Sequence, residues 1–202
     1  MGGATTKPTL ILASASPRRL DLLRRAGIAP DAVEAPEIDE SPLDREPPRA
    51  LVLRLARAKA EAVADRYPGA FVLAGDTVVA CARRILPKPA SEAEARRCLE
   101  LLSGRRHRVH GGVAVIAPGG KCPSRCKVRH VETSVSFKRL QADEIAGYLA
   151  SEEWRGKAGG YAIQGRAGLF VRGINGSYDN VVGLPLFETG QLLRGLGFGK
   201  LL

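Results

Sequence analysis

Apolar residues along the chain group into short runs of strand length that alternate with longer stretches of helical spacing. The short runs predict strands at residues 9–13, 33–38, 71–74, 78–81, 109–116 and 128–137, the last two forming a long hairpin. Apolar positions three and four residues apart predict helices at residues 17–26, 48–67, 91–104, 142–152 and 185–196. This mixture is typical of an α/β or α+β domain.

One glycine-rich segment departs from this regular pattern. Residues 156–185 contain eight glycines but retain apolar pairs such as Phe170-Val171, which predicts ordered loops and strands rather than a linker. No internal repeat, low-complexity run or domain linker occurs elsewhere in the sequence. We therefore expect one domain spanning residues 1–202, with a core of its own.

Hydrophobic content changes this picture only by excluding membrane insertion. Apolar residues make up 45% of the 202 residues, but no stretch reaches the about 18 consecutive apolar residues that a spanning helix needs. Residues 1–8 are small and polar and lack the apolar core of a secretory signal. The sequence therefore predicts a cytoplasmic protein with no membrane partner.

The charge balance narrows the class of ligand. Lys and Arg total 31 against 21 acidic residues, a net charge of +10, which favours polyanionic ligands. A general nucleic-acid binder should carry aromatic stacking platforms, yet aromatic residues are only 5% of the chain and no nucleic-acid motif occurs. We therefore expect small phosphorylated ligands and no nucleic acid.

Four cysteines, at positions 81, 98, 122 and 126, do not form a recognisable metal pattern. A structural zinc site needs two closely spaced ligand pairs, whereas Cys81 and Cys98 lie far apart. Cys122 and Cys126 could form half a metal knuckle or a short disulfide loop. We expect free thiols at all four positions, although the sequence does not define the role of Cys122 and Cys126.

A candidate phosphate site lies where the first predicted strand meets the first predicted helix. Small hydroxyl residues, Ser14 and Ser16, precede Pro17, and two arginines follow at once, Arg18 and Arg19. Free backbone N–H groups, the helix dipole and guanidinium charges then converge on one spot. Arginine opposes the dipole at a helix start, so binding of phosphate explains this arrangement better than a capped, solvated helix does.

Carboxylates at two other places could take part in the same chemistry. Asp76, in Gly75-Asp76-Thr77, follows an apolar strand, and α/β folds place catalytic groups at strand ends. Glu37 and Asp39 share one side of an extended chain and could hold Mg²⁺ or Mn²⁺. Taken alone, the first group could be a turn and the second a solvated acidic edge.

In order along the chain, a set of short motifs resembles the Maf family of nucleotide pyrophosphatases. The matches are Ser14-x-Ser16-Pro17-Arg18-Arg19, Ala58-Lys59-Ala60, Gly75-Asp76-Thr77, Lys88-Pro89, Leu102-Ser103-Gly104, residues 157–165, Asn175-Gly176-Ser177-Tyr178 and Val182-Gly183-Leu184-Pro185. Each motif is weak alone, but the ordered set covers nearly the whole chain. The resemblance implies an α/β fold similar to the inosine-triphosphate pyrophosphatase (Maf/Ham1) fold, with an elongated mixed β-sheet, surrounding helices and a central cleft between two lobes. It also implies a homodimer.

The same resemblance implies hydrolysis of a nucleoside triphosphate to the monophosphate and pyrophosphate, with Mg²⁺ or Mn²⁺. It makes Asp76 the general base, with Glu37, Asp39 and Asp76 as candidate metal ligands. The implied phosphate-binding residues are Ser14, Ser16, Arg18, Arg19, Lys59 and Lys88.

Two further motifs indicate which nucleotide is cut. Residues 163–165 and 176–178 are similar to the family branch that acts on dTTP and UTP, which implies that Arg18, Thr77 and Gln164 set the substrate specificity. The Gln164 amide could pair with the N3–H and O4 of uracil or thymine, or instead bond its own loop. The alternatives are a 7-methyl-GTP pyrophosphatase of the same family, an enzyme for modified pyrimidine nucleotides, and a nucleotide-binding regulator of cell division without catalysis.

Overall fold

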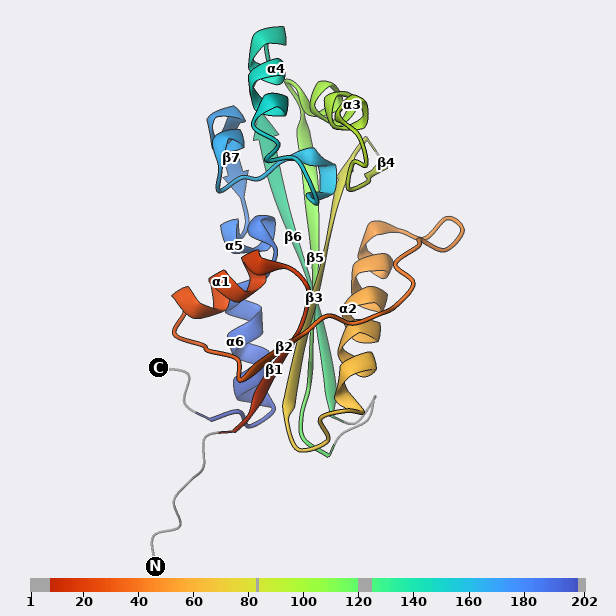
Figure 1. The fold of residues 1–202 in the computed structure, drawn as a ribbon, viewed down its shortest axis with the longest axis vertical. Helices are drawn as coiled ribbons and strands as arrows, with labels where there is room; N and C mark the ends of the chain where they lie inside the picture. Colours follow the sequence, from red (N-terminus) through yellow and green to blue (C-terminus); the bar gives the residue numbers. More distant parts are fainter. Residues whose placement is uncertain (1–7, 83, 120–124, 200–202) are drawn as a thin grey trace, which may run out of the picture.

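A long mixed sheet forms the centre of the protein (Figure 1). The computed structural model describes residues 8–82, 84–119 and 125–199. Residues 1–7, which carry the argument about a secretory signal, and Cys122 lie outside this range. Within it, no helix is long and apolar enough to cross a membrane.

Seven strands make up the sheet, in the order β2-β1-β3-β5-β6-β7, with β4 paired to β3. The long antiparallel strands are β3 (Phe71–Cys81), β5 (Arg106–Ile116) and β6 (Cys126–Phe137). The shorter strands are β1 (Leu10–Ala13), β2 (Ala32–Glu34), β4 (Arg84–Leu86) and β7 (Val171–Asn175). Because β1 pairs in parallel with both β2 and β3, the sheet is mixed, as expected.

Helices flank the lower half of the sheet on both sides in Figure 1, and further helices lie toward its upper end. The lower helices are α1 (Pro17–Arg25), α2 (Pro48–Ala64) and α6 (Leu186–Gly195). The upper elements are α3 (Glu92–Leu102), α4 (Ala142–Ala150) and the 3₁₀ turns η1 (Ala158–Gly160) and η2 (Arg166–Phe170), whereas α5 (Tyr178–Val182) lies at mid-height beside α1.

Alternation along the strands separates the two faces of the core. On β1, Leu10 and Leu12 belong to the large cluster that includes residues of α1, α3, α4 and α6, whereas Ile11 and Ala13 pack with α2. Helix α2 lies unusually close to β5: a Cβ at Gly112 would lie 2.1 Å from the carbonyl oxygen of Val52. Glycine is therefore required at this position for α2 to reach the sheet.

The predicted elements are present, although several boundaries differ, and two of the differences affect the candidate site residues. Gly75-Asp76-Thr77 lies in the middle of β3, so the placement of Asp76 at a strand end is wrong. The second strand ends at Glu34 rather than at residue 38. Pro36 lacks the N–H that a further ladder bond would need, so the chain leaves the sheet before Glu37.

Thiol chemistry also differs in part from the expectation. Cys81 and Cys98 are free and buried, which confirms the prediction for these two residues. Cys126, at the start of β6, is disulfide-bonded, so the prediction of a free thiol is wrong there. The sequence leaves a short disulfide loop open as the alternative interpretation for this residue.

Candidate active site

The candidate site lies at a gap in one edge of β3. On this edge β1 pairs with β3 only as far as Ala74, and β4 begins to pair at Val79. Among the described strands, residues 75–78 therefore have a neighbour only on the β5 side. The gap leaves Asp76 and Thr77 at the edge of the sheet without a strand covering them.

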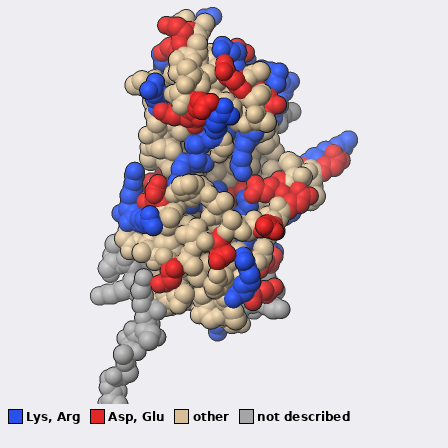
Figure 2. Space-filling view, viewed as in Figure 1, with Lys and Arg blue, Asp and Glu red and all other residues tan. Residues whose placement is uncertain are grey.

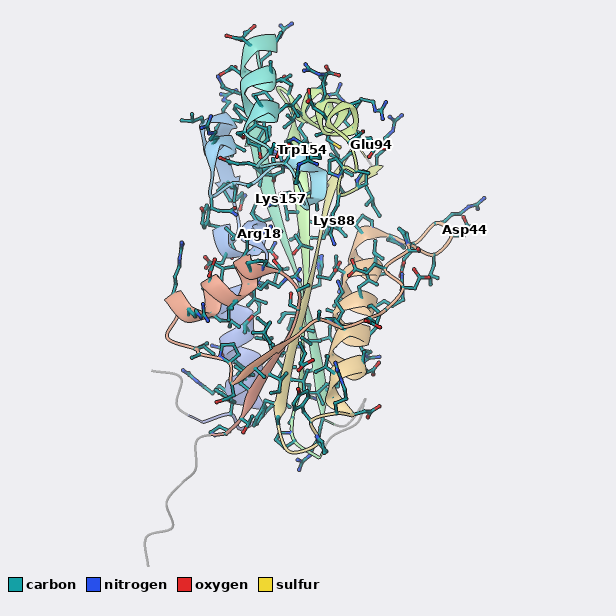
Figure 3. The ribbon with its side chains drawn as sticks, in the orientation of Figure 1. Arg18, Asp44, Lys88, Glu94, Trp154 and Lys157 are labelled. Atoms are coloured by element: carbon teal, nitrogen blue, oxygen red, sulfur yellow. The ribbon has the colours of Figure 1, made fainter. Side chains whose placement is uncertain are left out.

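A cavity of about 620 Å³ opens at this gap. We call the residues that β1, α1, α2 and β3 contribute the lower wall, and residues 155–164, which lie between α4 and η2, the upper wall. Figure 2 shows Lys and Arg gathered around a hollow at mid-height of the molecule. In Figure 3, Arg18 lies below this region and Lys157 above it, with Lys88 to one side.

Nine of the residues singled out from the sequence line this one cavity. They are Ser14, Ser16, Arg18, Arg19, Lys59, Asp76, Thr77, Lys88 and Gln164. They come from segments far apart in the sequence, which the gap in β3 brings together. This convergence supports a common site, although it does not assign a role to any one of them.

Glu37 and Asp39 are not brought to the cavity. Both are exposed, and Asp39 accepts a hydrogen bond from the backbone N–H of Ser41 at 2.8 Å. Pro36 and Glu40 line the cavity instead. The two predicted carboxylates do share an exposed side, as side-chain alternation requires, but that side faces solvent.

Two carboxylates and two lysines form a continuous chain in the cavity. The Lys59 ammonium lies 2.7 Å from Asp76 Oδ1 and 2.7 Å from Glu40 Oε1. The other Glu40 oxygen lies 3.2 Å from Lys88 Nζ. Asp76 and Lys59 are both buried, so their charges are poorly screened by solvent. Burial would raise the pKa of Glu40, but Lys59 and Lys88 outweigh this effect and hold the pKa below its ordinary value.

Arg19 connects the parts of the lower wall. Its Nε donates to the carbonyl of Gly183 at 2.8 Å, and its Nη1 donates to Ser14 Oγ at 3.0 Å. Its Nη2 donates to Thr77 Oγ1 at 3.4 Å. Burial lowers the pKa of Arg19, and the charges of Asp76 and Glu40 oppose this shift. Arg19 thus holds the β1–α1 connection, β3 and the segment after α5 in one arrangement.

Arg18 is less constrained than Arg19. Its hydrogen bonds are long, 3.3 Å from Nε to the carbonyl of Val182 and 3.5 Å from Nη2 to the carbonyl of Gly156. Burial, followed by the charge of Arg19, lowers the pKa of Arg18. An anion in the cavity would therefore find a guanidinium that is only weakly held by the protein.

The upper wall adds cations that the sequence reasoning missed. Arg155 and Lys157 line the cavity, and Lys157 Nζ donates to the carbonyl of Arg155 at 2.9 Å. Burial, then the charge of Arg18, lowers the pKa of Lys157, and Glu153 opposes the shift. Lys157 belongs to one of the matched motifs, and this membership could have identified it as a site residue. No motif in the sequence pointed to Arg155 or Glu40 as site residues.

Counting side chains gives the cavity a strong positive balance. Six cationic side chains line it, Arg18, Arg19, Lys59, Lys88, Arg155 and Lys157, against the two carboxylates Glu40 and Asp76, which leaves four net positive charges. A nucleoside triphosphate carries about four negative charges near neutral pH, so its charge is matched by this cavity.

Gln164 is one of the residues that line the cavity. The residue is exposed, and in the described part of the chain its side chain has no hydrogen-bond partner. It does not bond its own glycine-rich loop, which was the alternative interpretation of the sequence. Two donors and one acceptor are therefore available to a ligand.

The sequence model of the Maf family, described as "Maf-like protein", matches residues 9–196. The chain belongs to this family. A curated relative from Paramagnetospirillum magneticum, named dTTP/UTP pyrophosphatase, is 64% identical over 189 residues, 94% of this chain and 97% of the relative. Relatives of the same name from Rhodospirillum rubrum and Caulobacter vibrioides are 60% and 59% identical, covering 94% and 95% of this chain and 88% and 97% of their own.

Solved structures show a weaker likeness. A HAM1 protein from Coxiella burnetii matches with a TM-score of 0.45 and 18% identity, over 66% of this chain and 74% of its own. A nucleoside-triphosphatase, dITP/XTP pyrophosphatase, from Mycobacterium abscessus matches with a TM-score of 0.43 and 18% identity, over 66% and 76%. Likeness at this level carries no argument about substrate or mechanism.

Proposed function

We propose that this protein hydrolyses dTTP and UTP to the nucleoside monophosphate and pyrophosphate. The observation that carries the proposal is the cavity itself, which among the described residues is lined by six cationic side chains, a buried carboxylate and a Gln side chain without a hydrogen-bond partner. The names of relatives that are about 60% identical over nearly their whole length agree with it. The homodimer and the single domain of residues 1–202 stay predictions of the sequence.

In this proposal Asp76 is the general base. Its Oδ1 is occupied by Lys59, but its Oδ2 accepts no hydrogen bond from the described residues. Oδ2 takes a proton from a water molecule whose oxygen attacks the α-phosphorus. The bond from the α-phosphorus to the bridging oxygen breaks, and the electron pair leaves with pyrophosphate. The cations of the cavity neutralise the leaving group's charge.

A divalent cation fits this donor set. Asp76 Oδ1 and Glu40 Oε1 both lie 2.7 Å from Lys59 Nζ, so the two carboxylates are close together, and Asp76 Oδ2 accepts no hydrogen bond from the described residues. The described residues contain no cluster of three or more His, Cys, Asp or Glu side chains for a metal, but Mg²⁺ is commonly held by one or two carboxylates together with substrate phosphates. We propose Asp76 and Glu40 as its ligands; when bound, the cation would neutralise phosphate charge.

Removal of the cation tests the metal part of the proposal. EDTA should abolish pyrophosphate release from dTTP, and Mg²⁺ or Mn²⁺ should restore it. Undiminished release in the presence of EDTA would contradict the metal requirement and leave the assignment of Asp76 intact.

Base selection is assigned to Gln164, with Arg18 and Thr77 beside the phosphates. The amide of Gln164 can accept from the N3–H of uracil or thymine and donate to O4. Cytosine offers the reverse pattern, so these groups stay unpaired when the amide keeps this orientation. Once a bound base excludes water from the amide, such mismatches cost about 1–3 kcal/mol each, enough for a tenfold to hundredfold preference for dTTP and UTP.

A panel of nucleoside triphosphates with detection of pyrophosphate tests the proposal. Hydrolysis in H₂¹⁸O should place the label in the monophosphate, because water attacks the α-phosphorus. Label in pyrophosphate would contradict the direction of attack. Preference for 7-methyl-GTP or CTP would contradict the base assignment, and binding of nucleotide without any release would favour a non-catalytic regulator.

A further inference from the structure

We infer that Glu153 is a positioning residue for base recognition, because its carboxylate fixes the turn that carries Gln164. This inference rests on the proposed function, since it takes Gln164 as the residue that contacts the base. Gln164 itself lies in a turn, outside any helix or strand. Its amide can discriminate between bases only if the backbone of this turn is held in place.

Two side chains hold the backbone on either side of Gln164. Glu153 Oε2 accepts the backbone N–H of Arg166 at 2.8 Å. The hydroxyl of Tyr148 accepts the backbone N–H of Ala162 at 3.0 Å. Burial raises the pKa of Tyr148 to about 12, so its hydroxyl is neutral near pH 7. The turn is thus fixed two residues before and two residues after Gln164.

The Glu153 carboxylate also packs directly against the turn. A Cβ at Gly165 would lie 2.1 Å from Glu153 Oε2, so a side chain at that position would displace the end of the Glu153 carboxylate. The Arg166 guanidinium, 3.6 Å from Glu153 Oε1, adds a charge contact at an exposed position. Gly165 is therefore explained by the approach of Glu153.

Glu153 is in turn attached to rigid structure. Trp154, which follows it, is 2% exposed and donates from its indole nitrogen to the carbonyl of Leu149 in α4 at 3.2 Å. In Figure 3 Trp154 lies above Lys157, at the top of the cavity region. The carboxylate therefore transmits the position of α4 to the Gln164 turn, without itself lining the cavity.

Variants at Glu153 and Gly165 test this role through the UTP-to-CTP ratio of kcat/KM. Glu153→Ala should lower the ratio by about tenfold, the value of one hydrogen bond to a charged group, with a smaller change in kcat for UTP. Glu153→Gln keeps an acceptor for Arg166 N–H and should stay near wild type. Asp143→Ala, which removes an exposed acid from α4, is the control and should leave the ratio unchanged.

Gly165→Ala is an independent way to release the Gln164 turn from Glu153, because the new methyl group displaces the Glu153 carboxylate. It should reproduce the lowered ratio, and it should add little to Glu153→Ala, where no carboxylate remains to be displaced. A wild-type ratio in Glu153→Ala would overturn the inference. So would equal losses for UTP and CTP, or additive effects in the double variant.

Failure of the proposed function would look different. A wild type that shows no preference for UTP over CTP removes the role of Gln164, and the inference with it. A wild type without any pyrophosphate release contradicts the proposed function, but amide exchange at residues 163–166 still tests the positioning. Exchange should be faster in Glu153→Ala than in Asp143→Ala, and equal rates would overturn the inference.

Discussion

The two walls of the cavity are built in different ways. The lower wall stands on regular elements and is held by short contacts between buried groups, such as Lys59 with Asp76 at 2.7 Å and Arg19 with Gly183 at 2.8 Å. The upper wall is a mostly irregular segment, and its Gln164 is exposed and has no hydrogen-bond partner among the described residues. Poorly screened charges suit phosphoryl chemistry, which is mostly positioning and neutralisation. An amide on a loop suits base choice.

Replacement of the lower wall's carboxylate should have the largest effect. Asp76→Asn keeps the shape of the side chain but cannot take a proton or carry the charge. We expect turnover to fall by about 10²–10⁴-fold with every nucleotide. Steady-state pyrophosphate release and a melting curve measure activity and fold together. Near-normal turnover would remove Asp76 from the mechanism.

Arg18 and Arg19 sharpen the comparison within the lower wall. Arg18→Ala should raise KM and lower kcat, with kcat/KM reduced about 10–100-fold. The reason is that charged hydrogen bonds to phosphate are lost both in the complex with bound substrate and in the transition state. Arg24→Ala, on the exposed part of α1, is the matched control. Arg19→Ala should also lower the melting temperature, since buried partners lose their donor. A stability loss without a kinetic change in Arg18→Ala would indicate a structural role.

The sequence predicted much of the lower wall because its signals are local. A strand followed by Ser14, Ser16 and a Pro-initiated helix is visible within residues 9–19. The gap in β3 could not be predicted, because it depends on where β1 and β4 stop pairing with the same strand. The sequence also could not show that Glu40 contacts Lys59 while Glu37 is exposed, because this contact joins residues far apart in the chain.

Gln164→Leu should weaken the choice of base without changing the hydrolysis step itself. The preference for UTP over CTP should fall about tenfold, because leucine can satisfy neither base. Gln191→Leu, at an exposed position of α6 away from the cavity, is the control. If Gln164→Leu kept the wild-type preference, Gln164 would have no role in base recognition.

His107 behind the upper wall should give a smaller effect, on stability. Its Nε2 lies 2.8 Å from the hydroxyl of Tyr161, and burial lowers its pKa to about 4. The unfolded chain therefore takes up the proton first, so the stabilisation is present above about pH 6.5 and is lost as the pH falls toward 4. Urea unfolding between pH 7.5 and 4 should show a shallower acid loss in His107→Phe than in wild type. Parallel curves would contradict this assignment.

The most direct test of the division between the walls is the UTP-to-CTP ratio of kcat/KM in wild type, Asp76→Asn and Gln164→Leu. The account predicts that Asp76→Asn lowers both values by the same factor and leaves the ratio unchanged, whereas Gln164→Leu lowers the ratio. A changed ratio in Asp76→Asn, or equal losses for both nucleotides in Gln164→Leu, would contradict it.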